Sequence, residues 1–136
     1  MYNFPIGVML ESFNKSIPES LAIAQKMGAQ GIQVYATYGD LSPKKLVGQA
    51  RKDFLNMVKD HGLKISALCG DLGHGFGNTE ENPQLIEDSK RILDLAKELE
   101  VPFVVGVKLP GNFSPDTAGR AIAESVLRLI AEAKAE

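Results

Sequence analysis

The sequence holds one cysteine, Cys69, no tryptophan, and no large excess of charge of either sign among its 136 residues. A single cysteine cannot form a disulfide within the chain, so we expect a reducing, cytoplasmic setting. The 15 basic and 17 acidic residues leave a net charge of −2, which predicts no binding of nucleic acid or of an anionic membrane surface. No apolar run approaches the roughly 18 residues of a membrane span, and Met1–Leu10 lacks the positively charged start of a signal peptide.

The sequence instead alternates four short apolar runs with four longer helical patterns. The runs are rich in branched and aromatic residues and poor in charge, as buried parallel strands are. They comprise Ile6–Leu10, Ile32–Ala36, Ile65–Cys69 and Phe103–Val107. Their spacing leaves room for a helix and two loops between successive runs. We therefore expect a single α/β domain over residues 1–136, made of four βα units around a parallel sheet.

Four positions have the composition of a helix start. Ser16 with Glu19 has the spacing of a capping box. Three further pairs place a capping side chain before a proline in the first turn of a helix. These pairs are Ser42-Pro43, Asn82-Pro83 and Ser114-Pro115. Gly28 and Gly62 stand where the first two helices are expected to end.

Three segments carry a resemblance to a known family: Ile6–Leu10, Gly31–Ala36 and Ile65–Gly73, the last of which continues into His74-Gly75-Phe76. Together with Asn82-Pro83 and Ser89–Ile92, they make residues of about 4–99 similar to the xylose isomerase-like TIM-barrel superfamily, and within it to the sugar phosphate isomerases and epimerases. Family members carry a histidine-containing segment at the end of the fourth strand, whereas this chain reads Val104–Pro110 there. Residues 102–136 are therefore a fourth βα unit of unidentified origin.

The resemblance implies half of a (β/α)₈ TIM barrel, since a complete barrel takes roughly 250 residues. It also implies an isomerase or epimerase that acts on a small sugar or sugar phosphate. Enzymes of the family bind a divalent metal such as Mn²⁺ or Mg²⁺ through Glu, Asp and His residues in the second half of the barrel, while paired carboxylates move a proton between carbons. None of those ligands can be assigned to a residue here, so we expect the chain alone to bind no metal and to be inactive. The alternative is an engineered fragment or chimera with a structural role only.

A sheet of four parallel strands can bury its apolar faces in two ways. Two copies of a half-barrel could pair edge to edge and form a homodimer with eight strands. Alternatively, helices on both faces would make an open flavodoxin-like doubly wound sheet, a small domain that binds a phosphate-bearing ligand. The spacing of the runs is compatible with both. The strand order separates them, being 1-2-3-4 in the barrel and 2-1-3-4 in the flavodoxin-like sheet.

In both architectures ligands bind at the carboxyl ends of the strands, and the glycine-rich loop Gly70–Glu81 is expected there. Its glycines permit close approach of a ligand, and Asp71 and His74 supply polar groups. The resemblance implies that this loop and Cys69 border the substrate pocket. The alternatives are a solvated surface loop and, for Cys69, a small core residue.

Three further residues at strand ends are candidates for binding a sugar. Glu11 follows the first run and Tyr38 the second, and a carboxylate and an aromatic ring both suit a sugar. The alternatives are a solvated loop carboxylate and, for the neighbouring Tyr35, a packing role. Lys108 follows the fourth run near the start of the last helix and would suit a phosphate, or else is a solvated lysine.

Overall fold

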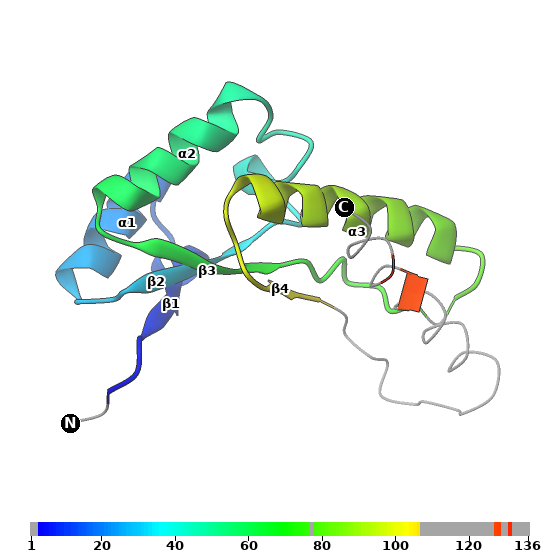
Figure 1. Cartoon of the computed structure of the whole chain (residues 1–136), viewed down its shortest axis with the longest axis horizontal. Helices are drawn as coiled ribbons and strands as arrows, with labels where there is room; N and C mark the ends of the chain where they lie inside the picture. The colour runs from blue at the N-terminus through cyan, green and yellow to red at the C-terminus, as the bar shows by residue number, and fades with distance from the viewer. Residues whose placement is uncertain (1–2, 77, 107–126, 129–130, 132–136) are drawn as a thin grey trace.

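The computed structural model describes residues 3–76, 78–106, 127–128 and 131, in which strands and helices alternate along the chain (Figure 1). The strands are β1 (Gly7–Met9), β2 (Gly31–Tyr35), β3 (Lys64–Cys69) and β4 (Val104–Val105), and the helices are α1 (Ile17–Lys26), α2 (Gln49–Asp60) and α3 (Asn82–Glu98). Two short 3₁₀ helices, η1 (Leu10–Phe13) and η2 (Gly39–Leu41), follow β1 and β2. The loop predicted at 108–113 and the helix predicted to begin at Ser114-Pro115 lie outside the described residues.

The four strands form one parallel sheet in the order β1-β2-β3-β4. Gly7 pairs with Gly31, Ile32 with Ile65, and Leu68 with Val104. Each crossover therefore advances by one strand in the same direction, as it does around a TIM barrel. A flavodoxin-like sheet would reverse direction after its first crossover. The flavodoxin-like alternative is therefore wrong for the described strands, and the α/β fold is that of a partial TIM barrel.

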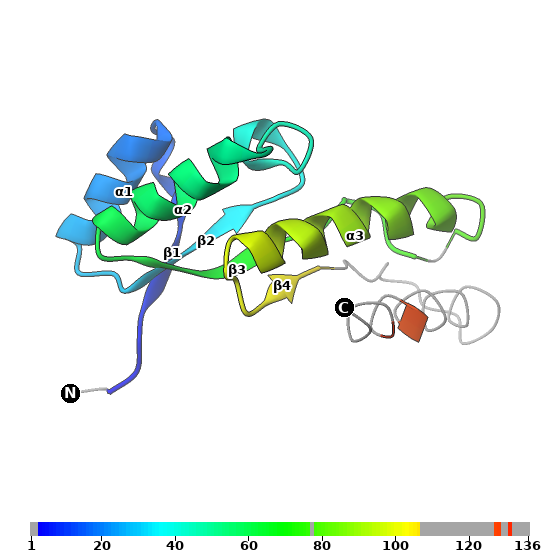
Figure 2. The same ribbon diagram turned by 45° about the horizontal axis from the view of Figure 1, so that its top comes forward.

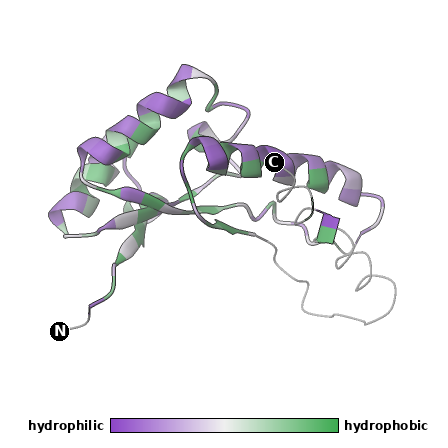
Figure 3. Ribbon diagram, in the orientation of Figure 1, coloured by the Kyte–Doolittle hydropathy of each residue, from purple (hydrophilic) through white to green (hydrophobic). Residues whose placement is uncertain are grey.

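The three described helices lie on the same face of this sheet, as Figure 1 and Figure 2 show from two directions. Hydrophobic and hydrophilic residues alternate along α2 and α3 (Figure 3), so each helix presents an apolar stripe to the strands. A single helical layer outside the sheet is the arrangement of a barrel wall. Within the described residues, no helix has the length and apolarity that a membrane span requires.

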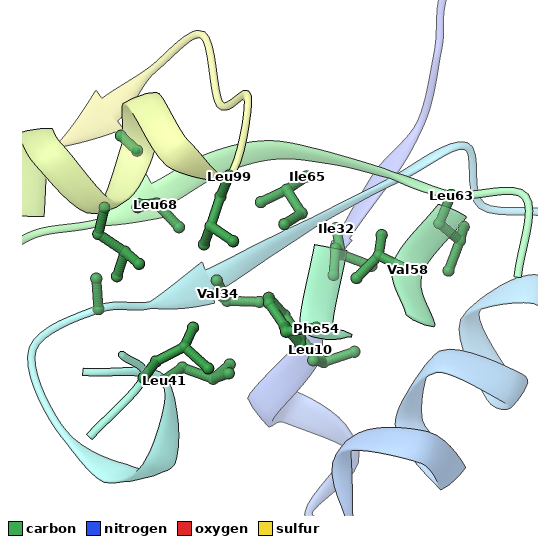
Figure 4. Packing of buried hydrophobic residues seen from close by; sticks show 14 of the residues in the cluster. Leu10, Ile32, Val34, Leu41, Phe54, Val58, Leu63, Ile65, Leu68 and Leu99 are labelled. Atoms are coloured by element: carbon green, nitrogen blue, oxygen red, sulfur yellow. The ribbon is translucent and has the colours of Figure 1, made fainter. Parts of the chain in front are cut away.

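The hydrophobic core lies between the helices and the covered face of the sheet. The side chains of Leu21, Ile32 and Leu68 are almost fully buried there, and those of Phe54 and Leu99 join the same cluster (Figure 4). Ile32 and Val34 point to the helices because alternate residues of a strand face opposite sides. The core thus fixes which residues of β2 remain on the uncovered face, namely Gln33 and Tyr35, both of which are partly exposed.

Local signals around α1 and at two helix ends are confirmed. The hydroxyl of Ser16 accepts a hydrogen bond from the backbone of Glu19, whose carboxylate accepts one from the backbone of Ser16 at 3.1 Å, so the capping box is complete. Gly28 and Gly62 have φ angles of 78° and 69°, values that favour glycine and end the first two helices.

Two of the predicted helix starts are wrong. Ser42 accepts a bond from the backbone of Leu46, which closes only one turn; the chain then breaks at Gly48, with φ 55° and ψ −126°, before α2 begins at Gln49. Asn82 lies inside the first turn of α3, and Glu81 occupies the N-cap position without a side-chain hydrogen bond to the helix. The buried side chain of Asn82 instead donates to the carbonyl of Phe76 at 3.0 Å and holds the preceding loop. In both places a tertiary contact or a glycine outweighs the local capping preference.

Candidate functional site

The carboxyl ends of β1, β2 and β3 bring together residues far apart in the sequence. Strand β1 runs directly into η1, which carries Glu11. The last residues of the next two strands, Tyr35 and Cys69, are paired in register. Tyr38 follows β2 by three residues and stacks near Tyr35. Three of the predicted site residues, Glu11, Tyr38 and Cys69, therefore lie at the same end of the sheet.

Glu11 replaces a missing rung of the β1–β2 ladder. The backbone leaves β1 after Met9 and turns into η1, so it no longer runs alongside β2. The Oε1 atom of Glu11 accepts a hydrogen bond from the backbone N–H of Tyr35 at 2.7 Å in its place. The other carboxylate oxygen, Oε2, is buried and has no hydrogen-bond partner among the described residues. Glu11 is therefore a structural link between two strands that keeps one acceptor oxygen unused, rather than a fully solvated loop carboxylate.

Two tyrosines lie beside this carboxylate. The ring centroids of Tyr35 and Tyr38 are 5.1 Å apart and the rings are tilted by 33°, a geometry common for attractive aromatic pairs. Partial desolvation raises the pKa of the Tyr38 phenol above its ordinary value, with the negative charge of Glu11 as the second cause. Tyr38 thus keeps its proton over the physiological range and presents a hydroxyl that can both donate and accept.

A hollow of about 120 Å³ opens at this cluster. Its polar lining comes from Glu11, Lys15, Ser20 and the two tyrosines, and its apolar lining from Leu10 and neighbouring aliphatic residues. We did not select Lys15 and Ser20 from the sequence. The signal for them was indirect: they flank the capping box that anchors α1 beside the end of β1. Carboxylate, hydroxyl and aromatic groups around one small hollow are suited to a polyhydroxylated ligand.

Cys69 is buried at the end of β3. This position is compatible with both predicted roles, a small core residue and a residue that borders the substrate pocket. Cys69 belongs to the sheet and is also paired in register with Tyr35 of the tyrosine pair. A contact between Cys69 and substrate stays a prediction.

The glycine-rich loop after β3 is held by contacts within itself. Asp71 accepts a hydrogen bond from the backbone of Gly73 at 2.9 Å, and Gly73 has a φ of 79° that favours glycine. His74 lies 3.7 Å from a carboxylate oxygen of Glu81, and both side chains are more than half exposed. The structure therefore gives Asp71 and His74 local partners. Their roles in substrate binding stay predictions, and Lys108 lies outside the described residues.

The described residues do not form a metal centre. No group of three or more His, Cys, Asp or Glu side chains among them is arranged to hold a metal ion. Glu11 stands next to tyrosines rather than other carboxylates, and the Nδ1 atom of His61 lies 2.8 Å from the carbonyl of Met57 at the end of α2. The described donors thus do not fit the divalent metal that the family resemblance implies.

A larger hollow, of about 410 Å³, lies between α2 and α3 and is lined mainly by charged side chains. Arg51, whose side chain is largely buried, pairs with Glu98 and donates to the carbonyl of Leu46 at 2.7 Å. These contacts join the two helices, so the size of this hollow reflects helix packing. We place the candidate site at the strand ends.

Comparison with known proteins agrees with this geometry. A family model described as xylose isomerase-like TIM barrel matches residues 21–136, so the match continues past Leu99, where the sequence resemblance ended. The chain is similar to a solved sugar phosphate isomerase/epimerase from Parabacteroides distasonis, with 22% identity and a TM-score of 0.68 over 95% of this chain and 47% of that chain.

Two further solved structures have the same fold. They are 3-keto-D-glucoside 4-epimerase from E. coli, with 20% identity and a TM-score of 0.71 over 98% of this chain and 52% of that chain, and the probable 3-DHS dehydratase from Bacillus anthracis, with 16% identity and a TM-score of 0.72 over 96% and 48%. No curated protein matches the chain. The chain spans about half the length of these solved structures.

Proposed function

Because the chain belongs to the xylose isomerase-like TIM-barrel family, we propose that it forms the sugar-binding part of a sugar phosphate isomerase/epimerase-type barrel. The proposed ligand site is the hollow beside Glu11, Tyr35 and Tyr38. This site lies at the carboxyl end of the strands, the end at which TIM-barrel enzymes bind their substrates. A small sugar or sugar phosphate is the proposed ligand class.

The unused Oε2 atom of Glu11 is the observation that carries this proposal. A buried acceptor without a partner costs about 1–3 kcal/mol, more when it is charged. A ligand hydroxyl that donates to Oε2 would remove this cost and form a charge-assisted hydrogen bond. The tyrosine pair supports the same ligand class. The hydroxyl of Tyr38 offers a second hydrogen-bonding group besides the Glu11 carboxylate, and its ring gives an apolar surface for the C–H groups of a sugar.

The described residues supply binding groups but not a complete set for catalysis. Moving a proton between neighbouring carbons takes an acid and a base on either side of the sugar. Among the described residues, Glu11 is the single carboxylate that lines the hollow. We therefore propose that the chain alone binds sugar without turning it over.

Sugar binding by variants of Glu11 tests the proposal. Titrations of the chain with free ketoses and with their phosphates, followed by calorimetry or NMR, are expected to saturate. Glu11→Gln keeps an oxygen that can accept from Tyr35 but places an amide where Oε2 stood, so affinity is expected to fall about tenfold, equivalent to 1.4 kcal/mol. Asp60→Asn, which changes an exposed carboxylate at the end of α2, is the control and should bind as the parent does.

Two results would contradict this function. One is that no sugar of the panel saturates the chain, which would favour a purely structural role. The other is that Glu11→Gln binds as tightly as the parent. Tighter binding of the phosphates than of the free sugars would identify a sugar phosphate as the ligand.

A further inference from the structure

Lys15 is the one positively charged side chain among the described residues that line the hollow beside Glu11. It is exposed and has no ion-pair partner within the described part of the chain. Lys45, Lys59 and Lys90, in contrast, each contact a carboxylate at 3.2 Å or less. An unpaired ammonium group at a ligand hollow can bind an anionic group of the ligand.

The backbone on both sides of Lys15 is fixed. On one side, Asn14 adopts the left-handed conformation with a φ of 51°, and its N–H donates to the carbonyl of Glu11 at 3.1 Å. On the other side, Ser16 caps α1 and forms the capping box with Glu19. The main chain thus holds Lys15 at the wall of the hollow before any ligand binds, so binding has to order only its side chain.

The nearby carboxylates do not neutralise Lys15. The carboxylate of Glu19 accepts hydrogen bonds from the backbone and the hydroxyl of Ser16, at 3.1 and 2.6 Å. Glu11 lines the same hollow as Lys15, yet no ion pair joins these two described side chains. Its Oε1 atom accepts from Tyr35, and its Oε2 atom has no partner among the described residues. The hollow therefore offers a cation and, separately, an unpartnered acceptor.

Ser20 adds a hydroxyl to the same hollow. This residue is buried, and its Oγ atom lies 3.5 Å from the carbonyl oxygen of Lys15. That distance exceeds the roughly 2.5–3.0 Å of an ordinary hydroxyl hydrogen bond, so the hydroxyl makes only a weak contact within the chain. A phosphate oxygen in the hollow would give it a charged and therefore stronger acceptor.

We propose that Lys15 binds the phosphate group of the ligand and thereby makes this hollow select sugar phosphates over free sugars. The inference rests on the proposed function, because it concerns the same site. The ammonium group of Lys15 and the hydroxyl of Ser20 donate to phosphate oxygens, while Oε2 of Glu11 accepts from a hydroxyl of the sugar. A free sugar makes the contact with Glu11 but not the contact with Lys15. Lys15 is therefore the specificity-determining residue of the site.

Paired titrations of a ketose and its phosphate test this inference, with fructose and fructose 6-phosphate as the first pair. In the parent chain the phosphate is expected to bind about tenfold more tightly than the free sugar, because a hydrogen bond between charged groups is stronger than one between neutral groups. Lys15→Gln removes the positive charge and should remove this preference, while its affinity for the free sugar stays that of the parent. Lys15→Arg keeps the charge and should keep the preference.

Lys26→Gln is the matched control. Lys26 is also an exposed lysine, and it lies in the last turn of α1, the helix that begins two residues after Lys15. The ten residues of α1 place it about 15 Å further along the helix axis, beyond the roughly 8 Å over which charges act at physiological salt. This substitution changes the net charge of the chain as much as Lys15→Gln does, but it should leave the preference for the phosphate unchanged. Circular dichroism verifies that all three variants are folded.

The outcomes separate this inference from the proposed function. Free ketoses that bind while their phosphates bind no more tightly would overturn the role of Lys15 and leave the proposed function intact. A preference that Lys15→Gln retains, or that Lys26→Gln reduces equally, would overturn it too, since the latter reflects net charge alone. Tighter binding of gluconate than of fructose 6-phosphate would show that the hollow selects a carboxylate rather than a phosphate. If neither the ketoses nor their phosphates bind, both proposals fail.

Discussion

The ends of β1 and β3 both carry an acidic residue followed by a polar loop, yet the structure uses them differently. Asp71, after β3, accepts a hydrogen bond from Gly73, only two residues away. Glu11, after β1, accepts one from Tyr35, 24 residues away on another strand, and its second oxygen is buried without a partner in the described part of the chain. A carboxylate whose partner lies in its own loop shapes that loop. A carboxylate that links two strands and has an unpartnered oxygen among the described residues is the stronger candidate for binding a ligand.

Leu68 belongs to the core that supports the ends of both strands. Its truncation is expected to have the largest effect on stability. Leu68 is fully buried in β3, which precedes the glycine-rich loop, and the neighbouring strand β2 ends at Tyr35. Leu68→Ala leaves a cavity in the core and should lower the free energy of unfolding by about 2–5 kcal/mol. Urea denaturation monitored by circular dichroism measures this. A loss no larger than that of the substitutions below would mean that the strand ends do not depend on this core.

Glu11→Ala comes next, because it removes a contact between strands. The backbone N–H of Tyr35 loses its acceptor, which costs about 1–3 kcal/mol, and removal of the unpartnered Oε2 offsets part of this cost, so the net loss is expected at the lower end of that range. Glu11→Gln retains an acceptor for that N–H and should recover most of this stability. The same denaturation measurement applies to both variants. If Glu11→Ala were as stable as the parent, Glu11 would resemble Asp71, and the contrast between the two regions would disappear.

The contrast also marks how far the sequence alone could lead. Four parallel strands, the three helices between them, the capping box at Ser16 and the family could be predicted, because periodic apolar patterns and local hydrogen bonds depend on residues that are near in sequence. The orphan oxygen of Glu11 could not, since it depends on η1 turning the chain away from β2 one residue after β1 ends. The sequence analysis did favour Glu11 as a candidate because it follows a strand, but it favoured the glycine-rich loop Gly70–Glu81 more strongly.

The predicted start of α2 was wrong for a related reason. Ser42-Pro43 has the local composition of a helix start, but Gly48 adopts a conformation with ψ −126° that no helix contains. Asn82 likewise has a capping side chain that the fold uses to hold Phe76. The sequence shows which residues can cap a helix, but it does not show which tertiary partner their side chains will have. Sequence patterns therefore locate helices better than they locate the first residue of each helix.

Asp71→Ala is expected to have a smaller effect on stability than Glu11→Ala. It removes a hydrogen bond that is exposed and confined to one turn, so the expected loss is about 0.5–1 kcal/mol. Asp71→Asn keeps an acceptor for Gly73 and should behave as the parent. Sugar affinity measured on both variants decides whether the glycine-rich loop takes part in binding. A drop in affinity as large as that of Glu11→Gln would place Asp71 in the site and remove the distinction drawn above.

The titration of Tyr38 gives the smallest and most local signal. Its pKa is raised above the ordinary value first by desolvation and then by the charge of Glu11. Tyr38 therefore contributes stability that is present below pH 10 and is lost as the pH rises through the folded pKa. Glu11→Gln removes the second cause and leaves the first, so the pKa should fall part of the way towards 10.0. Ultraviolet difference spectra, with Tyr38→Phe to assign the transition, measure it.

The Tyr38 titration is informative because the alternatives predict different directions. If Glu11 were solvated like an ordinary loop carboxylate, its charge would be screened and Glu11→Gln would leave the Tyr38 transition where it was. If a bound sugar donates to the unused oxygen of Glu11, saturation with that sugar should lower the pKa of Tyr38 by spreading the carboxylate charge, provided the sugar does not also bury the phenol. An upward shift on saturation would mean that burial of Tyr38 outweighs the effect on Glu11, and would locate the sugar over the ring rather than over the carboxylate.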